Sequence, residues 1–297
     1  MAREAAMVAN LPRISVVVPV LNGATTIDAQ LDSILRQPTE LPFEVIVSDD
    51  GSTDGTQERV LSIRTRDDRV LLITRNGPKQ FGAGEGSARN RGVAAARAPL
   101  ILFADADDVT ARGWLEAGYE VLRDSICVDL RREYWKLNPG HSRSLPQYAI
   151  GVEFAGAPSV SGGALGIRRD VFREMGGFDE NLGVACDTEF GLRLYRSGIV
   201  PTQVPLSVVH VRLSTSAPQV FRRHMKLATV AALLAREYGD LLALSPRTKL
   251  SALRGWLWLL LHARLLLTGE GRLRWARVLG RSVGGLTGWR RHGILVA

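Results

Sequence analysis

Short apolar runs alternate with helix-like stretches between residues 14 and 104, and this alternation limits the possible folds more than any other feature. Each run is five to seven residues long, as a buried strand should be. The runs are residues 14–20, 43–48, 70–74 and 100–104. Between the first two, residues 25–35 repeat apolar side chains every third or fourth position, which is typical of a helix. Strands that alternate with helices predict an α/β fold, with a mainly parallel sheet covered by helices.

Acidic residues directly follow two of the predicted strands. Residues 48–55 read SDDGSTDG, and residues 103–108 read FADADD. In parallel sheets, ligands bind beyond the carboxyl ends of the strands, which is where both segments fall. Three crowded carboxylates repel one another, and Mg²⁺ or Mn²⁺ relieves that repulsion with help from substrate phosphates. The alternatives are a solvated acidic turn at 103–108 and, at 48–55, an Asx turn in which Asp54 caps the next helix.

A glycine-rich segment, residues 82–92, reads GAGEGSARNRG. Glycines allow a ligand to approach the backbone closely, and the side chains of Arg89 and Arg91 suit a diphosphate. The GxxxxGK[ST] pattern of a phosphate-binding loop is not present. A loop that precedes a helix remains the alternative interpretation.

Together, these segments resemble glycosyltransferase family 2, whose members have the GT-A fold. The resemblance extends over residues 13–212 and rests on four segments, which are residues 16–22, 48–56, 88–92 and 102–108. It implies a GT-A, Rossmann-like catalytic domain at residues 1–213. Residues 214–297 read as a basic helical extension that follows this domain.

The resemblance also implies roles for individual residues on the donor side. Pro19 and Asn22 shape the nucleotide pocket, Asp50 contacts the base, and Arg89 lies near the pocket. The DxD motif is Asp105 and Asp107, which hold a cation and the ribose-diphosphate. In some relatives the later aspartate, here Asp108, shares that role.

On the acceptor side, the resemblance implies a catalytic base at Asp187. The family has a Glu-Asp pair here, whereas this chain has Cys186 before Asp187. Helix N-cap is the alternative role for Asp187. His210 resembles a histidine that some relatives place near the metal, although a structural histidine is the alternative. Residues 161–164, SGGA, resemble a segment near the donor sugar or else form a packed strand.

The implied reaction is inverting transfer of a sugar from a nucleotide-diphospho-sugar, with UDP favoured. The acceptor is a hydroxyl on a glycan or a lipid-linked acceptor, and the cofactor is Mn²⁺ or Mg²⁺. A nucleotidyltransferase is disfavoured because residues 19–23, PVLNG, lack a basic glycine-rich loop. A non-catalytic nucleotide- or carbohydrate-binding protein with this fold is the other alternative.

The basic residues are concentrated at the C-terminus. From Ser214 onward there are 14 Lys and Arg against three acids, and the preceding residues hold 24 basic against 27 acidic side chains. Residues 246–267, within the longer stretch 246–281, also repeat leucines at helical spacing beside Trp256 and Trp258. This pattern predicts either peripheral contact with a membrane or a helix packed on the catalytic domain. No DNA- or RNA-binding motif accompanies it, so we expect no nucleic-acid partner.

Two distant cysteines, Cys127 and Cys186, favour a reducing compartment, and the first eleven residues lack the features of a signal peptide. We therefore expect a cytoplasmic protein. If residues 246–281 bind a membrane, we expect peripheral association with the inner face of the cell membrane.

Overall fold

The structure is a computed structural model that describes residues 11–75, 84–139, 146–243 and 249–294, with the backbone alone at 249–253. The predictions for residues 1–10, 82–83 and 246–248 lie outside the described residues. The chain divides into two compact units. The first extends to Glu153 and continues from Pro158 to Arg212, and the second consists of residues 154–157 and the chain from Leu213 onward.

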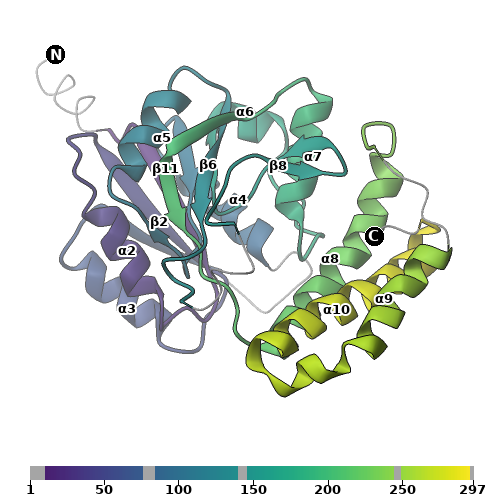
Figure 1. Ribbon diagram of the computed structural model, residues 1–297. Helices are drawn as coiled ribbons and strands as arrows, with labels where there is room; N and C mark the ends of the chain where they lie inside the picture. Colours follow the sequence, from purple (N-terminus) through teal and green to yellow (C-terminus); the bar gives the residue numbers. More distant parts are fainter. Residues whose placement is uncertain (1–10, 76–83, 140–145, 244–248, 295–297) are drawn as a thin grey trace, which may run out of the picture. The chain divides into compact units, whose positions relative to one another are not determined.

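The first unit is built on a nine-stranded sheet in the order β3-β2-β1-β4-β10-β6-β11-β5, with β7 paired to β6 (Figure 1). The strands are β1 (Ile14–Val20), β2 (Phe43–Asp49), β3 (Val70–Thr74), β4 (Leu100–Phe103), β5 (Val109–Thr110), β6 (Cys127–Glu133), β7 (Tyr148–Ala149), β10 (Leu165–Arg168) and β11 (Thr202–His210). The pairs β1–β2, β2–β3, β1–β4 and β6–β11 are parallel, whereas β10 is antiparallel to both its neighbours. The predicted α/β fold with a mainly parallel sheet is confirmed.

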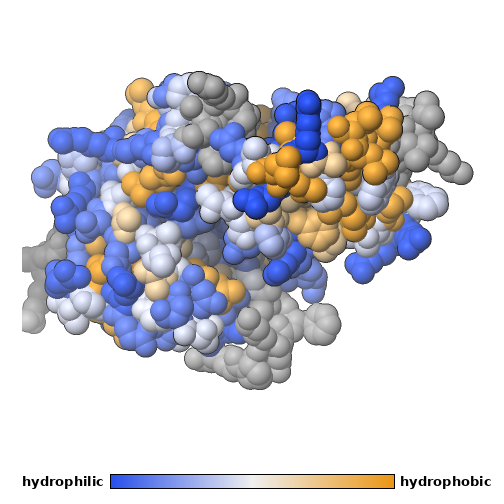
Figure 2. Space-filling view, turned by 60° about the horizontal axis from the view of Figure 1, so that its bottom comes forward, coloured by the Kyte–Doolittle hydropathy of each residue, from blue (hydrophilic) through white to orange (hydrophobic). Residues whose placement is uncertain are grey.

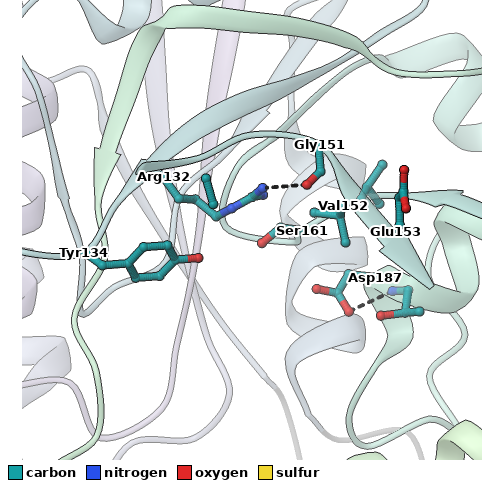
Figure 3. A pocket seen from close by; sticks show the side chains of 10 residues that line it. Arg132, Tyr134, Gly151, Val152, Glu153, Ser161 and Asp187 are labelled. Carbon is teal, nitrogen blue, oxygen red and sulfur yellow. Dashed lines mark hydrogen bonds between the residues drawn. The ribbon is translucent and has the colours of Figure 1, made fainter. Parts of the chain in front are cut away.

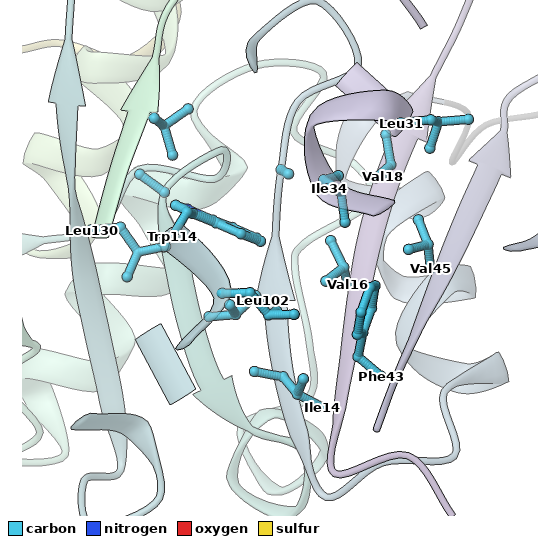
Figure 4. Close-up of a cluster of buried hydrophobic side chains, with 14 of the residues drawn as sticks. Ile14, Val16, Val18, Leu31, Ile34, Phe43, Val45, Leu102, Trp114 and Leu130 are labelled. Atoms are coloured by element: carbon cyan, nitrogen blue, oxygen red, sulfur yellow. The ribbon is translucent and has the colours of Figure 1, made fainter. Parts of the chain in front are cut away.

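Six helices described in this unit cover the two faces of the sheet. They are α2 (Ile27–Leu35), α3 (Thr56–Arg64), α4 (Glu85–Ala95), α5 (Trp114–Leu122), α6 (Arg169–Glu174) and α7 (Cys186–Arg196). Side chains alternate along β1, so Val16 and Val18 join one buried cluster and Val17 joins the other. The first cluster includes Leu31 of α2 and Trp114 of α5 (Figure 4). This alternation explains why β1 is apolar at every position except Ser15.

Four phenylalanines in the second cluster fix α7 against the sheet. Phe103 ends β4, Phe172 lies in α6, Phe190 lies in α7, and Phe178 lies between the two helices. Their ring centroids are 5.0–5.8 Å apart in tilted or edge-on pairs. Because Phe103 directly precedes the acidic segment 104–108, this cluster ties the start of α7 to the end of β4.

A two-stranded sheet, β8 (Val152–Phe154) and β9 (Ala157–Ser159), follows β7. After it, residues 162–163 form a turn that leads into β10, so the SGGA segment is not the packed strand that was one of its two interpretations.

The second unit contains α8 (Ala217–Glu237), α9 (Lys249–Leu261), the 3₁₀ helix η1 (Ala263–Leu267) and α10 (Gly269–His292). Glycines of α10 pack directly on the backbone of α8. A Cβ atom on Gly284 would lie 2.2 Å from the carbonyl oxygen of Met225, and one on Gly280 would lie 2.6 Å from that of Phe221. Glycines lower helix propensity, but in α10 they permit this close packing. Within the described residues, no helix is long and apolar enough to cross a membrane.

Candidate active site

Two loops at the carboxyl ends of β1 and β2 are cross-linked by short hydrogen bonds. The backbone N–H of Asn22 donates to Ser52 Oγ at 2.8 Å, and Asn22 Oδ1 accepts from the N–H of Thr53 at 2.9 Å. Asn22 has a positive φ of 54°, a conformation that asparagine adopts more readily than most residues. Pro19 is buried in β1 and is paired in register with Ser48 of β2. Both predicted pocket residues therefore lie at this edge of the sheet.

The adjacent aspartates Asp49 and Asp50 are both buried, but their carboxylates contact different groups. The carboxylate of Asp49 accepts hydrogen bonds from the N–H groups of Gly51 and Ser52, so it shapes the turn. The Oδ1 atom of Asp50 instead lies 2.8 Å from Nη2 of Arg91 and 3.8 Å from Nε of Arg75. Asp50 therefore takes no part in shaping the turn, and two arginines lie beside its carboxylate.

The side chain of Asp54 forms the turn before α3, in line with the Asx turn that was the alternative interpretation of residues 48–55. Its Oδ1 accepts from the N–H of Thr56, the first residue of α3, and its Oδ2 accepts from the N–H of Ala24 at 3.0 Å. The helix N-cap residue itself is Gly55. Asp54 thus supports the loop, while Asp50 lies outside this set of turn contacts.

Asp105 is anchored by a fully buried arginine. Arg89, on α4, is 1% exposed, and its Nη2 lies 2.7 Å from Asp105 Oδ1 and 2.6 Å from Glu85 Oε1. Burial raises the pKa of Asp105 to about 6, and the charges of Glu85 and Asp107 act in the same direction while Arg89 opposes them. Arg89 therefore compensates the charge of this acidic segment only in part.

The later aspartates of the segment are held by Arg212, at the end of β11. The N–H of Arg212 donates to Asp108 Oδ1 at 2.7 Å, and its Nε donates to the carbonyl oxygen of Asp107 at 2.9 Å. Asp108 is buried, and that burial, together with Asp105 and Asp107, raises its pKa well above the ordinary value. The side chain of Asp107 is exposed. A solvated acidic turn does not describe the segment, because two of its three carboxylates are wholly or partly buried.

His210 lies at the end of β11, in register with Val109, the residue after Asp108. Its Nδ1 lies 2.9 Å from Glu133 Oε2, and its Nε2 lies 3.3 Å from Lys136 Nζ. Because an ammonium group only donates, these contacts fit the tautomer with its proton on Nδ1 and a lone pair on Nε2. Metal-binding histidines are commonly oriented by such a carboxylate.

A divalent cation suits these donors. The raised pKa values of Asp105 and Asp108 indicate carboxylate charge that the protein compensates only in part. Over the described ranges, no three His, Cys, Asp or Glu side chains are grouped so that they could hold a metal ion by themselves. Mg²⁺ commonly takes one or two carboxylates and completes its shell with water and substrate phosphates, so an open set of ligands fits that mode of binding.

Asp187 lies in the first turn of α7, one residue after the helix begins, so the helix N-cap alternative was wrong. The N-cap residue is Ala185, whose positive φ of 59° is unfavourable for alanine. The carboxylate of Asp187 accepts from the N–H of Gly162 at 2.9 Å and from the N–H of Thr188 at 2.8 Å. Cys186, in place of the family's glutamate, is buried, and burial raises the pKa of its thiol to about 12.

The turn at Gly162 and Gly163 lies between the two halves of the site. A Cβ atom on Gly163 would be 2.3 Å from Asp105 Oδ2, and one on Gly162 would be 2.5 Å from Cζ of Arg89. The same turn donates a hydrogen bond to Asp187. Glycine is therefore required at both positions, and the turn brings Asp105 and Asp187 to one place.

A pocket opens beside Asp187 (Figure 3). Its lining comes from β6, the segment around β7 and β8, the loop before β10, and the start of α7. The lining residues are Arg132, Tyr134, Ala149, Gly151, Val152, Glu153, Val160, Ser161, Asp187 and Thr188. Hydroxyl, carboxylate and guanidinium groups thus surround the space that adjoins Asp187.

Sequence reasoning missed several residues of this arrangement. Arg212 holds Asp107 and Asp108 from 104–105 positions away, and Glu133 orients His210. The signal for Arg212 was its position just after the strand that carries His210. No local pattern pointed to Arg132 or Tyr134, which come from the stretch around residues 125–150 that carried no clear periodicity.

Comparison with known proteins gives a family match over residues 15–176, to the family described as Glycosyl transferase family 2. Among curated proteins, validoxylamine A glucosyltransferase of Streptomyces hygroscopicus subsp. jinggangensis is 44% identical over 97 residues. The Escherichia coli UDP-Glc:alpha-D-GlcNAc-diphosphoundecaprenol beta-1,3-glucosyltransferase WfgD is 34% identical over 103 residues. These matches cover 32% and 35% of this chain, and 22% and 38% of the two relatives.

Among solved structures, the mannosyltransferase PcManGT from Pyrobaculum calidifontis, in complex with GDP-Man and Mn²⁺, has a TM-score of 0.62 and 19% identity. The match covers 94% of this chain and 87% of that one. At this identity, the likeness bears on the fold, and it confirms the predicted GT-A architecture.

Proposed function

The chain belongs to glycosyl transferase family 2, and from this premise we propose that it is an inverting glycosyltransferase. Residues 1–213 form the catalytic domain, and residues 214–297 form a basic helical extension. The enzyme moves a sugar from a nucleotide-diphospho-sugar to a hydroxyl of a glycan or lipid-linked acceptor. The observation that carries the proposal is the Gly162–Gly163 turn, which contacts the candidate donor carboxylate Asp105 on one side and the candidate base Asp187 on the other.

The donor nucleotide binds at the carboxyl ends of β1, β2 and β4. Pro19 and Asn22 frame the pocket, and Asp50 accepts a hydrogen bond from an N–H of the base. A UDP-sugar is favoured, in line with the UDP-Glc in the name of WfgD, while the GDP-Man of PcManGT keeps guanosine as an alternative. Among the described residues, no acceptor bonds Nε or Nη1 of the buried Arg89, and unused donors of this kind suit an anion such as the diphosphate.

Asp105, Asp107, Asp108 and His210 are the residues that would hold Mn²⁺ or Mg²⁺. When bound, the cation neutralises the charge that develops on the departing diphosphate. The partly compensated carboxylates support this assignment, and His210 would bind the cation through Nε2 once Lys136, whose Nζ lies 3.3 Å from that atom, moves away.

Asp187 acts as the general base. It takes the proton of the acceptor hydroxyl as that oxygen bonds to the anomeric carbon, and the bond from this carbon to the diphosphate oxygen breaks on the opposite face. Direct displacement inverts the anomeric centre. The two backbone N–H groups that hold Asp187 support the assignment, because they orient its carboxylate beside the pocket.

The acceptor binds in that pocket. Tyr134 and Ser161 offer hydroxyl groups there, and Glu153 and Asp187 offer carboxylates, which suits the hydroxyl groups of a sugar. WfgD is named for a sugar acceptor on a lipid diphosphate, which supports an acceptor of that class.

A thermal-shift screen of UDP, GDP, dTDP and their sugars, with and without Mn²⁺, tests the donor site. A ligand that binds the folded state must raise the melting temperature. We expect one nucleotide with Mn²⁺ to raise it in the wild type and in Asp32→Ala, which removes an exposed carboxylate of α2, but not in Asp107→Ala. If millimolar nucleotide shifts none of them, the transferase proposal is wrong.

Activity then separates an enzyme from a non-catalytic binding protein on the same fold. Asp187→Asn should keep the nucleotide shift of the wild type and lose sugar transfer. Equal turnover by the wild type and Asp187→Asn would show that Asp187 is not the general base.

Peripheral contact with the inner face of the cell membrane, through residues 246–281, is part of the same proposal and places the enzyme in the cytoplasm. Large leucines of α9 and η1 are exposed, namely Leu257 (56%), Leu260 (77%), Leu261 (68%) and Leu267 (86%). Leu260 and Leu261 lie three and four residues after Leu257, on one helical face. Figure 2 shows apolar side chains gathered at the right of its view, where the C-terminal helices lie, beside hydrophilic ones. Such a surface suits a bilayer with anionic headgroups.

Flotation with vesicles of phosphatidylcholine, with or without phosphatidylglycerol, tests this contact. We expect the wild type to float only with the anionic vesicles. The double variant Leu260→Gln/Leu261→Gln should remain at the bottom of the gradient. The control Leu206→Gln, which changes an 81% exposed leucine of the first unit, should float like the wild type. Flotation of the double variant at wild-type level would refute the contact.

A further inference from the structure

A buried ion pair on β6 contacts both the N–H and the carbonyl oxygen of Gly151. Asp129 and Arg132 are 1% and 6% exposed, and Arg132 Nη1 lies 3.0 Å from Asp129 Oδ1. Asp129 Oδ2 accepts from the N–H of Gly151 at 2.6 Å, while Arg132 Nη2 lies 3.4 Å from both Asp129 Oδ2 and the carbonyl oxygen of Gly151. Because these contacts lie on the N–H and C=O of one residue, they fix its orientation as well as its position.

The glycine so held has a backbone that few other residues tolerate. Gly151 has a φ of +76°, and a Cβ atom there would lie 2.9 Å from Nε2 of Gln203, on the neighbouring strand β11. It joins β7, which pairs with the carboxyl end of β6, to β8. The turn is thus fixed by β6 on one side and limited by β11 on another.

This turn forms one wall of the pocket beside Asp187. Gly151, Val152 and Glu153 line the pocket, and Ser161 and Asp187 line it from other segments (Figure 3). Arg132 also lines the pocket, with its guanidinium directed at the carbonyl oxygen of Gly151. Any shift of the Gly151 turn therefore changes the distance between this wall and Asp187.

We propose that Asp129 and Arg132 are positioning residues that set the width of the acceptor pocket by holding the Gly151 turn. The inference rests on the proposed transferase function, since it assigns this pocket to the acceptor. The charge of Arg132 is matched by Asp129, and the other charged groups of the lining, Glu153 and Asp187, are acids. The pocket therefore suits an uncharged, hydroxyl-rich sugar unit and disfavours a phosphate or carboxylate at this subsite.

Hydrogen exchange tests the hold on the turn without any substrate. Asp129→Asn and Gly151→Ala should each speed exchange of the amides of residues 149–153 by about tenfold or more, because the turn opens more often. Gly151→Ala keeps the ion pair, so it carries the test if Asp129→Asn does not fold. Glu44→Gln is the matched control, since Glu44 is also a buried carboxylate paired with an arginine, at the amino end of β2. Wild-type exchange of residues 149–153 in both turn variants would overturn the proposal.

Transfer kinetics test whether the contacts of Asp129 and Arg132 with Gly151 affect acceptor binding. With octyl β-D-glucoside as the acceptor probe, the variants should raise the acceptor KM by roughly tenfold while donor hydrolysis stays within about twofold of the wild type. The Glu44→Gln control should lower the melting temperature without changing that KM. A parallel loss of donor hydrolysis and transfer, or an unchanged KM despite faster exchange, would overturn the positioning role. Failure of the proposed function itself would show differently, as absent donor hydrolysis in the wild type.

Discussion

Replacement of Gly163 by alanine is the sharpest test of the arrangement at the candidate site. The added Cβ atom would lie 2.3 Å from Asp105 Oδ2, whereas ordinary contacts start near 3.4 Å. The carboxylate has little room to withdraw, because its other oxygen lies 2.7 Å from Arg89 Nη2. Arg89 itself is buried and faces Gly162, where an added Cβ atom would lie 2.5 Å from Cζ. Either Asp105 or the turn must therefore move by about 1 Å.

The size of the effect follows from this displacement. Overpacking of a well-packed site costs typically 1–3 kcal/mol, and about 2 kcal/mol would lower the melting temperature of a unit of this size by roughly 4–8 °C. A shift of about 1 Å in a reacting group can cost roughly 100-fold in rate. Since the turn contacts both Asp105 and Asp187, we expect nucleotide binding and transfer to fall together.

The assay is a thermal melt with and without nucleotide and Mn²⁺, followed by measurement of nucleotide release. Gly183→Ala is the matched control, because a Cβ atom there meets no other atom within 4 Å and the residue lies only four positions before Asp187. We expect Gly183→Ala to behave as the wild type. If Gly163→Ala keeps the nucleotide shift and the wild-type rate, the argument that the turn joins the two halves of the site is refuted.

Four further outcomes are expected. Asp187→Asn should lower the transfer rate by about 10²–10⁴-fold with an unchanged nucleotide shift in the melt. EDTA should abolish that shift, and Mn²⁺ or Mg²⁺ should restore it; a shift unaffected by EDTA would exclude a metal in nucleotide binding. Gly284→Leu should unfold the C-terminal helices, since its Cβ atom would lie 2.2 Å from the carbonyl oxygen of Met225, and circular dichroism that matches the wild type would contradict the close packing. Burial and then the charge of Arg281 lower the pKa of His224 to about 4 from 6.5, so the folded form resists protonation. Stability of the C-terminal unit should therefore decline as pH falls from about 6.5 to about 4, and less steeply in His224→Gln.

Much of the first unit could be predicted from local sequence pattern. The β1 strand is apolar at every position except Ser15 because it lies mid-sheet with helices on both faces, and that run is visible in the sequence. The ends of β1, β2 and β4 were placed to within a residue, since each run stops at a turn or an aspartate. Parallel strands then bring their carboxyl ends to one edge of the sheet, which is why the sequence alone could group Asn22, Asp50 and Asp105.

The second half of the sheet was harder to predict. The β11 strand extends over Thr202–His210, but its first four residues are mostly exposed and include Pro205, so the sequence there carries no strand pattern. Residues 125–150 gave no clear prediction, yet they contain β6, whose buried Asp129 and Arg132 break the apolar pattern of a strand. Buried charges mislead a reading based on hydrophobicity, and here they are the charges that hold the Gly151 turn.

Contacts between distant positions explain why parts of the site escaped prediction. Gly162 and Gly163 could be noted as small, but only the fold shows that Arg89 and Asp105, more than fifty positions earlier, occupy the space where side chains would stand. A glycine selected for such contact looks the same in the sequence as one selected for a flexible loop. The distinction matters for mechanism. A flexible loop would leave Asp105 and Asp187 to move independently, whereas a turn wedged between them makes the separation of the two carboxylates a property of the backbone, and the Gly163→Ala and Gly183→Ala variants tell these cases apart.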